Sequence, residues 1–125
     1  MLTFAELAAS RRAWIDDVLR PWCLAARRAE LIKAEQEWND IAGRVDADRT
    51  LWLWAWSRFP CLYVDGLGGL EESWPVRVVL RNGQSVRGYP DNRMTGRGEL
   101  YLTSREGAHG PFVIDDIVEI TRVDD

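Results

Sequence analysis

The chain has 125 residues, of which 46% are hydrophobic and 29% charged, the composition of one folded domain rather than of a disordered chain. Its 16 basic and 20 acidic residues give a net charge of −4, which argues against a protein that binds nucleic acid through a broad basic surface. No apolar run approaches the ~18 residues that a membrane-spanning helix needs, so we expect no membrane partner.

The first sixty residues are predicted to be helical. Thr3 and Glu6 have the spacing of a capping box, and apolar residues recur after them at helical spacing. Pro21 is expected to end or kink this first helix and to begin a second one that runs to Ala42, with Gly43 as its C-terminal cap. The pattern therefore predicts a helical hairpin or one kinked helix.

The segment 50–60 has three tryptophans at alternate positions and is compatible with two structures. Alternation favours a strand, whereas capping residues before the segment and a proline at its end favour a short helix, which we expect. The seven tryptophans of the chain are expected to fill an aromatic core between its two halves. Alternatively, Trp52, Trp54 and Trp56 form an aromatic binding surface, because tryptophan is frequent at the energetic centres of interfaces.

The chain is predicted to form one folding unit with a helical region at 1–60, a connector at 61–75 and a β-rich region at 76–125. The connector contains the glycine-rich stretch 65–70. This stretch lacks the residues and spacing of phosphate-binding and dinucleotide-binding loops, so it is expected to be a plain loop.

The β-rich region is predicted to contain five short strands. Strands at 76–80 and 85–89 would form a hairpin, and a three-residue loop with Gly83 in the left-handed conformation would place the apolar residues of both strands on one face. Further strands are expected at 99–103, 112–114 and 117–121, with a turn at 107–111 and a tight corner at Asp115-Asp116. The predicted fold class is α+β, with the helical hairpin and the short Trp-rich helix packed on a bent five-stranded antiparallel sheet or small barrel.

The pattern Val76-x-Val78-x-Leu80-x-Asn82-Gly83-x-x-Val86-x-Gly88 resembles the first sequence motif of Sm and Sm-like proteins, and residues 112–120 are similar to their closing strands. The resemblance covers less than half of the chain and implies a small SH3-like barrel. Where the family has its basic RNA-contacting residues, this chain has Asp115-Asp116. The family's Phe-Asp-x-x-Met-Asn stretch after the first motif is at best echoed by Asp91-Asn92-Arg93-Met94. The resemblance therefore supports the barrel and weakens the expectation of RNA binding.

Neither a catalytic site nor a metal or cofactor site is expected. His109 is the only histidine of the chain, and in a glycine-rich segment it is expected to be a turn residue. Cys23 and Cys61 are expected to be free thiols in a reducing cytoplasm, since two cysteines make no disulfide framework. The N-terminal residues lack the basic start of a signal peptide, which also favours the cytoplasm.

The candidate binding residues outside the tryptophans are arginines. The three-residue loop places Arg77 opposite Arg87 on the outward face of the sheet, where facing like charges need compensation. Either an acid such as Glu119 lies between them, or the side chains point apart into solvent, or the pair accepts a carboxylate or phosphate of a partner. Arg81 and Arg93 would extend such a patch.

Three functions are compatible with the sequence. The favoured one is a non-catalytic cytoplasmic interaction module that binds another protein through the helical half or the outward face of the barrel. The alternatives are an Sm-like domain that binds RNA or DNA, and an immunity or inhibitor protein whose acidic surface masks a basic partner. A homo-oligomer is compatible with the favoured function.

Overall fold

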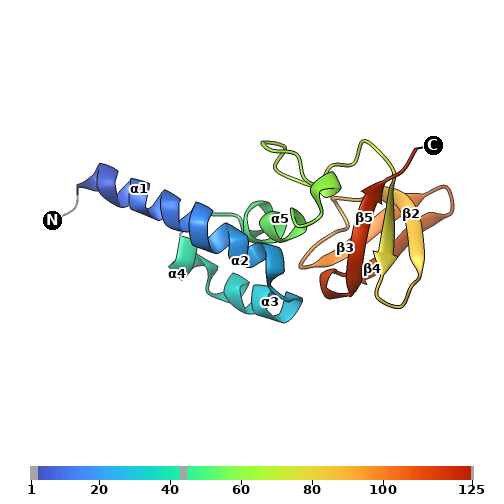
Figure 1. Cartoon of the computed structure of the whole chain (residues 1–125), viewed down its shortest axis with the longest axis horizontal. Helices are drawn as coiled ribbons and strands as arrows, with labels where there is room; N and C mark the ends of the chain where they lie inside the picture. Colours follow the sequence, from blue (N-terminus) through green and yellow to red (C-terminus); the bar gives the residue numbers. More distant parts are fainter. Residues whose placement is uncertain (1–2, 43–44, 125) are drawn as a thin grey trace.

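The computed structural model describes residues 3–42 and 45–124, in which a helical region precedes a five-stranded antiparallel sheet (Figure 1). The predicted α+β class is therefore confirmed. The helical region contains α1 (Phe4–Trp14), the π-helix η1 (Ile15–Leu19), α2 (Arg20–Ala25), α3 (Arg28–Gln36), α4 (Trp38–Ala42), η2 (Ala47–Arg49), α5 (Leu51–Trp56) and η3 (Pro60–Leu62). The sheet contains β1 (Val76–Leu80), β2 (Ser85–Pro90), β3 (Glu99–Ser104), β4 (Gly107–Val113) and β5 (Ile117–Arg122), with η4 (Ile114–Asp116) before β5.

The first helical stretch, α1 to α2, continues through Pro21, so the alternative in which Pro21 ends the helix is wrong, while a kink there stays a prediction. The predicted helix from Pro21 to Ala42 is also wrong, because Ala26 and Arg27 are extended. Its start is as predicted, because the Thr3 hydroxyl accepts a hydrogen bond from the Glu6 amide at 3.2 Å. The stretch continues because the wider π-helical turn of η1, in which the Arg20 amide donates to the Ile15 carbonyl, directly precedes the proline. A π-turn relieves the clash between a proline ring and the preceding turn of an α-helix. We call residues 4–25 the arm.

The arm ends at Ala26 and Arg27, both of which are extended. The Arg27 amide donates a hydrogen bond to the Glu30 carboxylate at 3.1 Å, which satisfies an amide that precedes α3. The chain therefore reverses five residues later than the proline suggested. The cap expected at Gly43 lies outside the described residues.

The tryptophan-rich segment is a helix, α5, as predicted. Five of its six residues are buried, among them Trp52 and Trp56, which are each 2% exposed. α5 packs against α2 and α3, and its side chains join one buried cluster with those of the sheet, including Val76, Val78 and Leu100. The helical half and the sheet thus share a hydrophobic core, with α5 between the arm and the sheet (Figure 1).

The hairpin of β1 and β2 has the predicted register. Val78 lies opposite Val86 and Val76 opposite Gly88, and the Leu80 amide donates to the Gln84 carbonyl at 2.8 Å across the loop. Gly83 has a φ of 88°, the left-handed conformation that the three-residue loop requires and that glycine adopts without strain. The alternation of apolar residues was informative here because this sheet has one buried face.

The order of the strands is β4-β3-β2-β1-β5, and within the described residues no ladder joins the two edge strands β4 and β5. The bent five-stranded sheet is confirmed, whereas the Sm-like barrel stays a prediction.

The predicted turn at 107–111 is wrong, because these residues form most of β4, and His109 lies in this strand opposite Leu102. An edge strand tolerates Pro111 because its missing amide need not bond to a neighbour. The predicted corner at Asp115-Asp116 is confirmed as part of η4.

Polar contacts join the arm's end and α3 to the sheet. Asp115 accepts a hydrogen bond from the Arg28 amide at 2.8 Å, and the Arg28 side chain donates to the Arg97 carbonyl at 2.7 Å. The half-buried Arg58 donates to the carbonyls of Cys23 and Ala26 at 2.7 and 2.8 Å. These bonds hold the C-terminal end of the arm in place. No helix of the described residues is long and apolar enough to cross a membrane.

Candidate functional site

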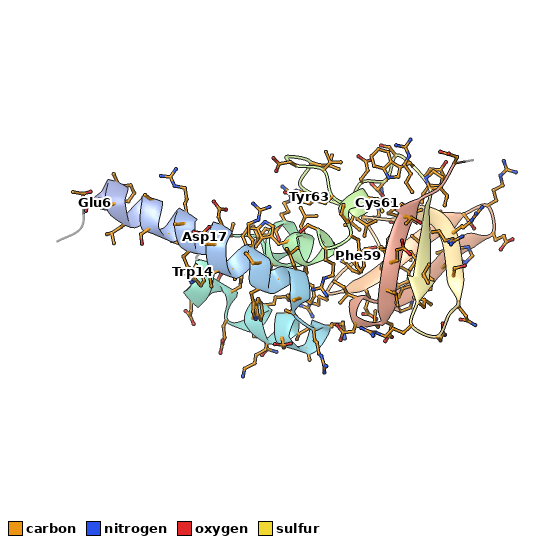
Figure 2. The ribbon with its side chains drawn as sticks, in the orientation of Figure 1. Glu6, Trp14, Asp17, Phe59, Cys61 and Tyr63 are labelled. Atoms are coloured by element: carbon orange, nitrogen blue, oxygen red, sulfur yellow. The ribbon has the colours of Figure 1, made fainter. Side chains whose placement is uncertain are left out.

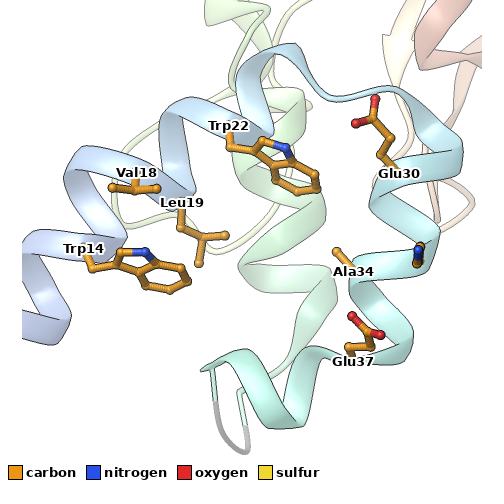
Figure 3. A pocket seen from close by; sticks show the side chains of 8 residues that line it. Trp14, Val18, Leu19, Trp22, Glu30, Ala34 and Glu37 are labelled. Atoms are coloured by element: carbon orange, nitrogen blue, oxygen red, sulfur yellow. The ribbon is translucent and has the colours of Figure 1, made fainter.

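An open apolar groove of about 680 Å³ lies between the arm and α3 (Figure 3). Trp14 and Glu37 lie towards one end of this groove, and Trp22 and Glu30 lie towards the other (Figure 3). The whole lining consists of Trp14, Val18, Leu19 and Trp22 from the arm and Glu30, Lys33, Ala34 and Glu37 from the segment that follows.

The arm's wall of the groove is apolar because three residues align along it. Trp14, Val18 and Trp22 are spaced by four residues, a spacing that drifts around a regular α-helix. The intervening π-helix η1 has more residues per turn, which reduces this drift and keeps the three side chains on one face. They are 41%, 52% and 38% exposed, although each is large enough to belong to a core.

The apolar face continues beyond the groove along α1. No described residue of α1 is buried, and Phe4 and Leu7 are 87% and 53% exposed. Figure 1 shows α1 extending away from the rest of the molecule, and Figure 2 shows Glu6 near its free end. We call five of the exposed apolar residues of the arm (Phe4, Leu7, Trp14, Val18 and Trp22) the stripe.

The opposite wall is the charged face of α3. Glu30, Lys33 and Glu37 are exposed along it, and the smaller Ala34 between them leaves the groove open. The other face of α3 is fixed by the molecule itself. Leu31 is fully buried there, and Glu35 accepts a hydrogen bond from the Trp52 indole and pairs with Arg97 at 3.1 Å. The groove wall therefore has a rigid support.

The structure separates the predicted arginines. Arg77 lies opposite Arg87, both are exposed, and no ion pair of either side chain occurs among the described residues. Glu119 lies opposite Val79 instead, so the expected compensation by this acid is not found. Arg81 does not extend the patch, because its side chain donates to the Asp115 carbonyl at 2.6 Å.

The predicted aromatic surface is wrong for Trp52 and Trp56, because both are buried, and Trp54 is half-buried against Trp38. The expectation that all seven tryptophans fill the core is also wrong, since Trp14 and Trp22 lie in the groove. Arg93 lines a polar pocket of about 340 Å³ with Trp52 and Trp56, and neither Arg77 nor Arg87 belongs to the lining of this pocket. The structure thus brings together Arg77 with Arg87, and Arg93 with two tryptophans.

The two thiols are free, as predicted, and they differ in burial. Cys23 is fully buried, whereas Cys61 is half-buried. Burial raises the pKa of Cys23 to about 11, although the nearby Arg58 and Arg20 oppose this shift, and burial also raises the pKa of Cys61. Neither thiol has the lowered pKa that a nucleophilic cysteine requires.

Sequence reasoning missed the groove. The spacing of Phe4, Leu7, Trp14, Val18 and Trp22 was visible, but an apolar face on a helix is ordinarily buried within its own chain.

Among residues 3–42 and 45–124, no three His, Cys, Asp or Glu side chains converge as metal ligands do. Comparisons with protein-family models, with curated proteins and with solved structures find no match for this chain.

Proposed function

We propose that this protein is a non-catalytic interaction module that binds an α-helix of another polypeptide chain in the groove. The observation that carries the proposal is the stripe, whose five large apolar side chains from Phe4 to Trp22 are between 38% and 87% exposed. Large exposed apolar patches mark interaction sites, and an amphipathic helix that places its apolar face in a groove is a recurrent mode of recognition.

The groove defines the chemistry of the bound helix. Its apolar residues, spaced by three and four, would contact Trp14, Val18 and Trp22. Basic residues beside them would approach Glu30 and Glu37, which outnumber the single Lys33 on the opposite wall. The free thiols fit a reducing compartment, so we place this interaction in the cytoplasm.

Two matched variants test the proposal. Val18 in the groove and Val118 on β5 are similarly exposed, at 52% and 59%. An aspartate therefore has a similar effect on the burial of either side chain. It places a negative charge in the groove in one variant and on the sheet in the other. Wild-type, Val18→Asp and Val118→Asp proteins are immobilised, and the polypeptides that each retains from its native cell lysate are quantified. A partner kept by the wild type and Val118→Asp but lost by Val18→Asp is expected.

Hydrogen–deuterium exchange of the complex then locates the bound segment. Protection is expected over 4–22 and 30–37, the two walls of the groove. The proposal would be overturned by a partner that the Val18→Asp protein retains and the Val118→Asp protein loses. It would also be overturned if the partner slowed hydrogen exchange in the sheet alone. Circular dichroism of each variant checks that the fold is intact.

A second candidate is recognition of an anionic group, including single-stranded RNA or DNA, at the outward face of β1 and β2. The facing, exposed Arg77 and Arg87 favour it, since two unpaired guanidinium groups suit a phosphate or carboxylate. Fluorescence anisotropy with a short labelled single strand tests it at low and physiological salt. The acidic net charge leads us to expect a dissociation constant weaker than about a micromolar.

A further inference from the structure

We infer that the helix bound in the groove is the arm of a second copy of this chain, placed antiparallel so that each α1 fills the groove of the other copy. This inference rests on the proposed function and names its partner. The arm has both complementary parts. Its N-terminal half presents Phe4 and Leu7 without a partner, and its C-terminal half presents the wall of Trp14, Val18 and Trp22. A two-fold axis near Ala13 would cover both parts at once.

The area of the stripe is sufficient for a pair, and it lies within the range of the largest apolar patch on an ordinary monomer, a patch that is often functional. The exposed parts of its five side chains amount to roughly 500 Å² per copy, because a large aromatic side chain presents about 150–250 Å² when fully exposed. Two copies would bury about 1,000 Å² through these side chains alone, which is the least that a specific interface requires.

The exposure of α1 supports a partner that covers it. α1 has 11 residues and none of them is buried. α1 is continuous with the rest of the arm, but its own residues gain no burial from the chain to which they belong, and most helical stability in proteins comes from such tertiary packing. Packing against a second arm would supply the contacts that the rest of its own chain does not.

The charges of the arm distinguish antiparallel from parallel packing. From N- to C-terminus the arm carries Glu6, the pair Arg11 and Arg12, the pair Asp16 and Asp17, and then Arg20. Each charge on one side of residues 13 and 14 thus has a charge of opposite sign at a similar distance on the other side. Antiparallel arms therefore place the basic pair of one copy beside the acidic pair of the other, whereas parallel arms place like charges together.

The other wall of the groove agrees with the same direction at its Glu37 end, whereas at the Trp22 end Glu6 of the second copy would approach Glu30. Glu37 lies towards the Trp14 end of the groove (Figure 3), and the antiparallel arrangement brings Arg11 and Arg12 of the second copy to that end. Neither arginine pairs with an acid among the described residues, since the Arg12 side chain donates only to the Ala8 carbonyl of its own helix. Both are therefore available to the second copy.

Sedimentation equilibrium of the full-length protein tests the inference. A mass of twice 14.3 kDa is expected, with dissociation on dilution. Val18→Asp should raise the dissociation constant at least about tenfold, because a charge would enter the buried stripe, while Val118→Asp should leave it unchanged. A monomer at all accessible concentrations, or a dimer broken by Val118→Asp and kept by Val18→Asp, would overturn the inference.

Charge reversal tests the direction. The double variant Arg11→Glu and Arg12→Glu should weaken the dimer, and adding Asp16→Arg and Asp17→Arg to the same chain should restore it. If the double variant Arg11→Glu and Arg12→Glu dimerises as well as the wild type, the arms are not antiparallel, because in antiparallel arms these substitutions replace attractive contacts with Asp16 and Asp17 by repulsive ones.

If the protein is monomeric but Val18→Asp still loses a partner from the lysate, the inference fails while the proposed function stands. If Val18→Asp forms no dimer and loses no lysate partner, self-association is the only interaction of the groove.

Discussion

The helices α5 and α1 show how differently the same kind of side chain can be used in one small protein. Both contain tryptophan among other apolar residues, yet five of the six residues of α5 are buried and none of the 11 in α1 is. α5 lies between the arm and the sheet, so neighbours cover it from several sides, whereas α1 extends beyond them (Figure 1). α5 is also wholly apolar, whereas α1 contains Glu6, Arg11 and Arg12, so composition and tertiary neighbours act in the same direction.

The largest effect is expected from truncating a tryptophan of α5. Trp56 is 2% exposed and packs against Phe59, with ring centroids 6.3 Å apart. Trp56→Ala should lower the free energy of unfolding by about 3–5 kcal/mol, because it removes buried area and leaves a cavity. Urea denaturation followed by fluorescence measures this change, and a loss below about 1 kcal/mol would show that α5 is not the core helix described above.

The next effect concerns Cys23, the buried thiol of the arm. The pKa of Cys23 is raised from 9.0 to about 11, mainly because burial disfavours the thiolate. The unfolded chain releases this proton at lower pH than the folded protein does, so the contribution to stability is complete below pH 9 and is lost as the pH rises through 11. The total is about 2 kcal/mol.

Cys23→Ala separates this contribution from those of other groups that titrate in the same range. The decline in unfolding free energy between mildly alkaline conditions and a pH near the raised pKa should be steeper for the wild type than for the variant. Equal slopes would show that Cys23 ionises as it does in water, which contradicts its complete burial in the structure.

A tryptophan of the arm should behave unlike Trp56. Trp14 is 41% exposed and lies on the groove wall (Figure 2). Trp14→Ala in dilute solution should cost clearly less than Trp56→Ala, since two fifths of the Trp14 side chain is already exposed, whereas Trp56 is almost wholly buried. The same substitution should strongly reduce self-association, measured by sedimentation. A destabilisation as large as that of Trp56→Ala would remove the contrast between the two helices.

Sequence reasoning succeeded where one buried face constrained the chain. The register of Val76, Val78 and Val86 followed from alternation, and the register in turn placed Arg77 opposite Arg87. The capping residues of α1 and the helical state of α5 were likewise local signals.

The failures have a different physical origin. Pro21 marked no helix boundary because a π-helical turn relieves its clash, and β4 includes Pro111 because an edge strand has a free side. Neither condition is visible in a local pattern. Predicting that Trp14 and Trp22 line a groove required knowing that α3 diverges from the arm, with α5 packed against both α2 and α3.

The smallest effect belongs to the outward face of the sheet, where nothing in the described residues neutralises Arg77 and Arg87. Facing like charges on paired strands are unfavourable, so Arg87→Gln should raise the free energy of unfolding by about 0.2–0.5 kcal/mol. A double-mutant cycle with Arg77→Gln isolates the pair, because backbone and packing effects of each substitution cancel. The measured coupling should be repulsive and should shrink as added salt screens the two charges. An attractive coupling, or one that salt does not change, would show that the two guanidinium groups are not in electrostatic contact across β1 and β2.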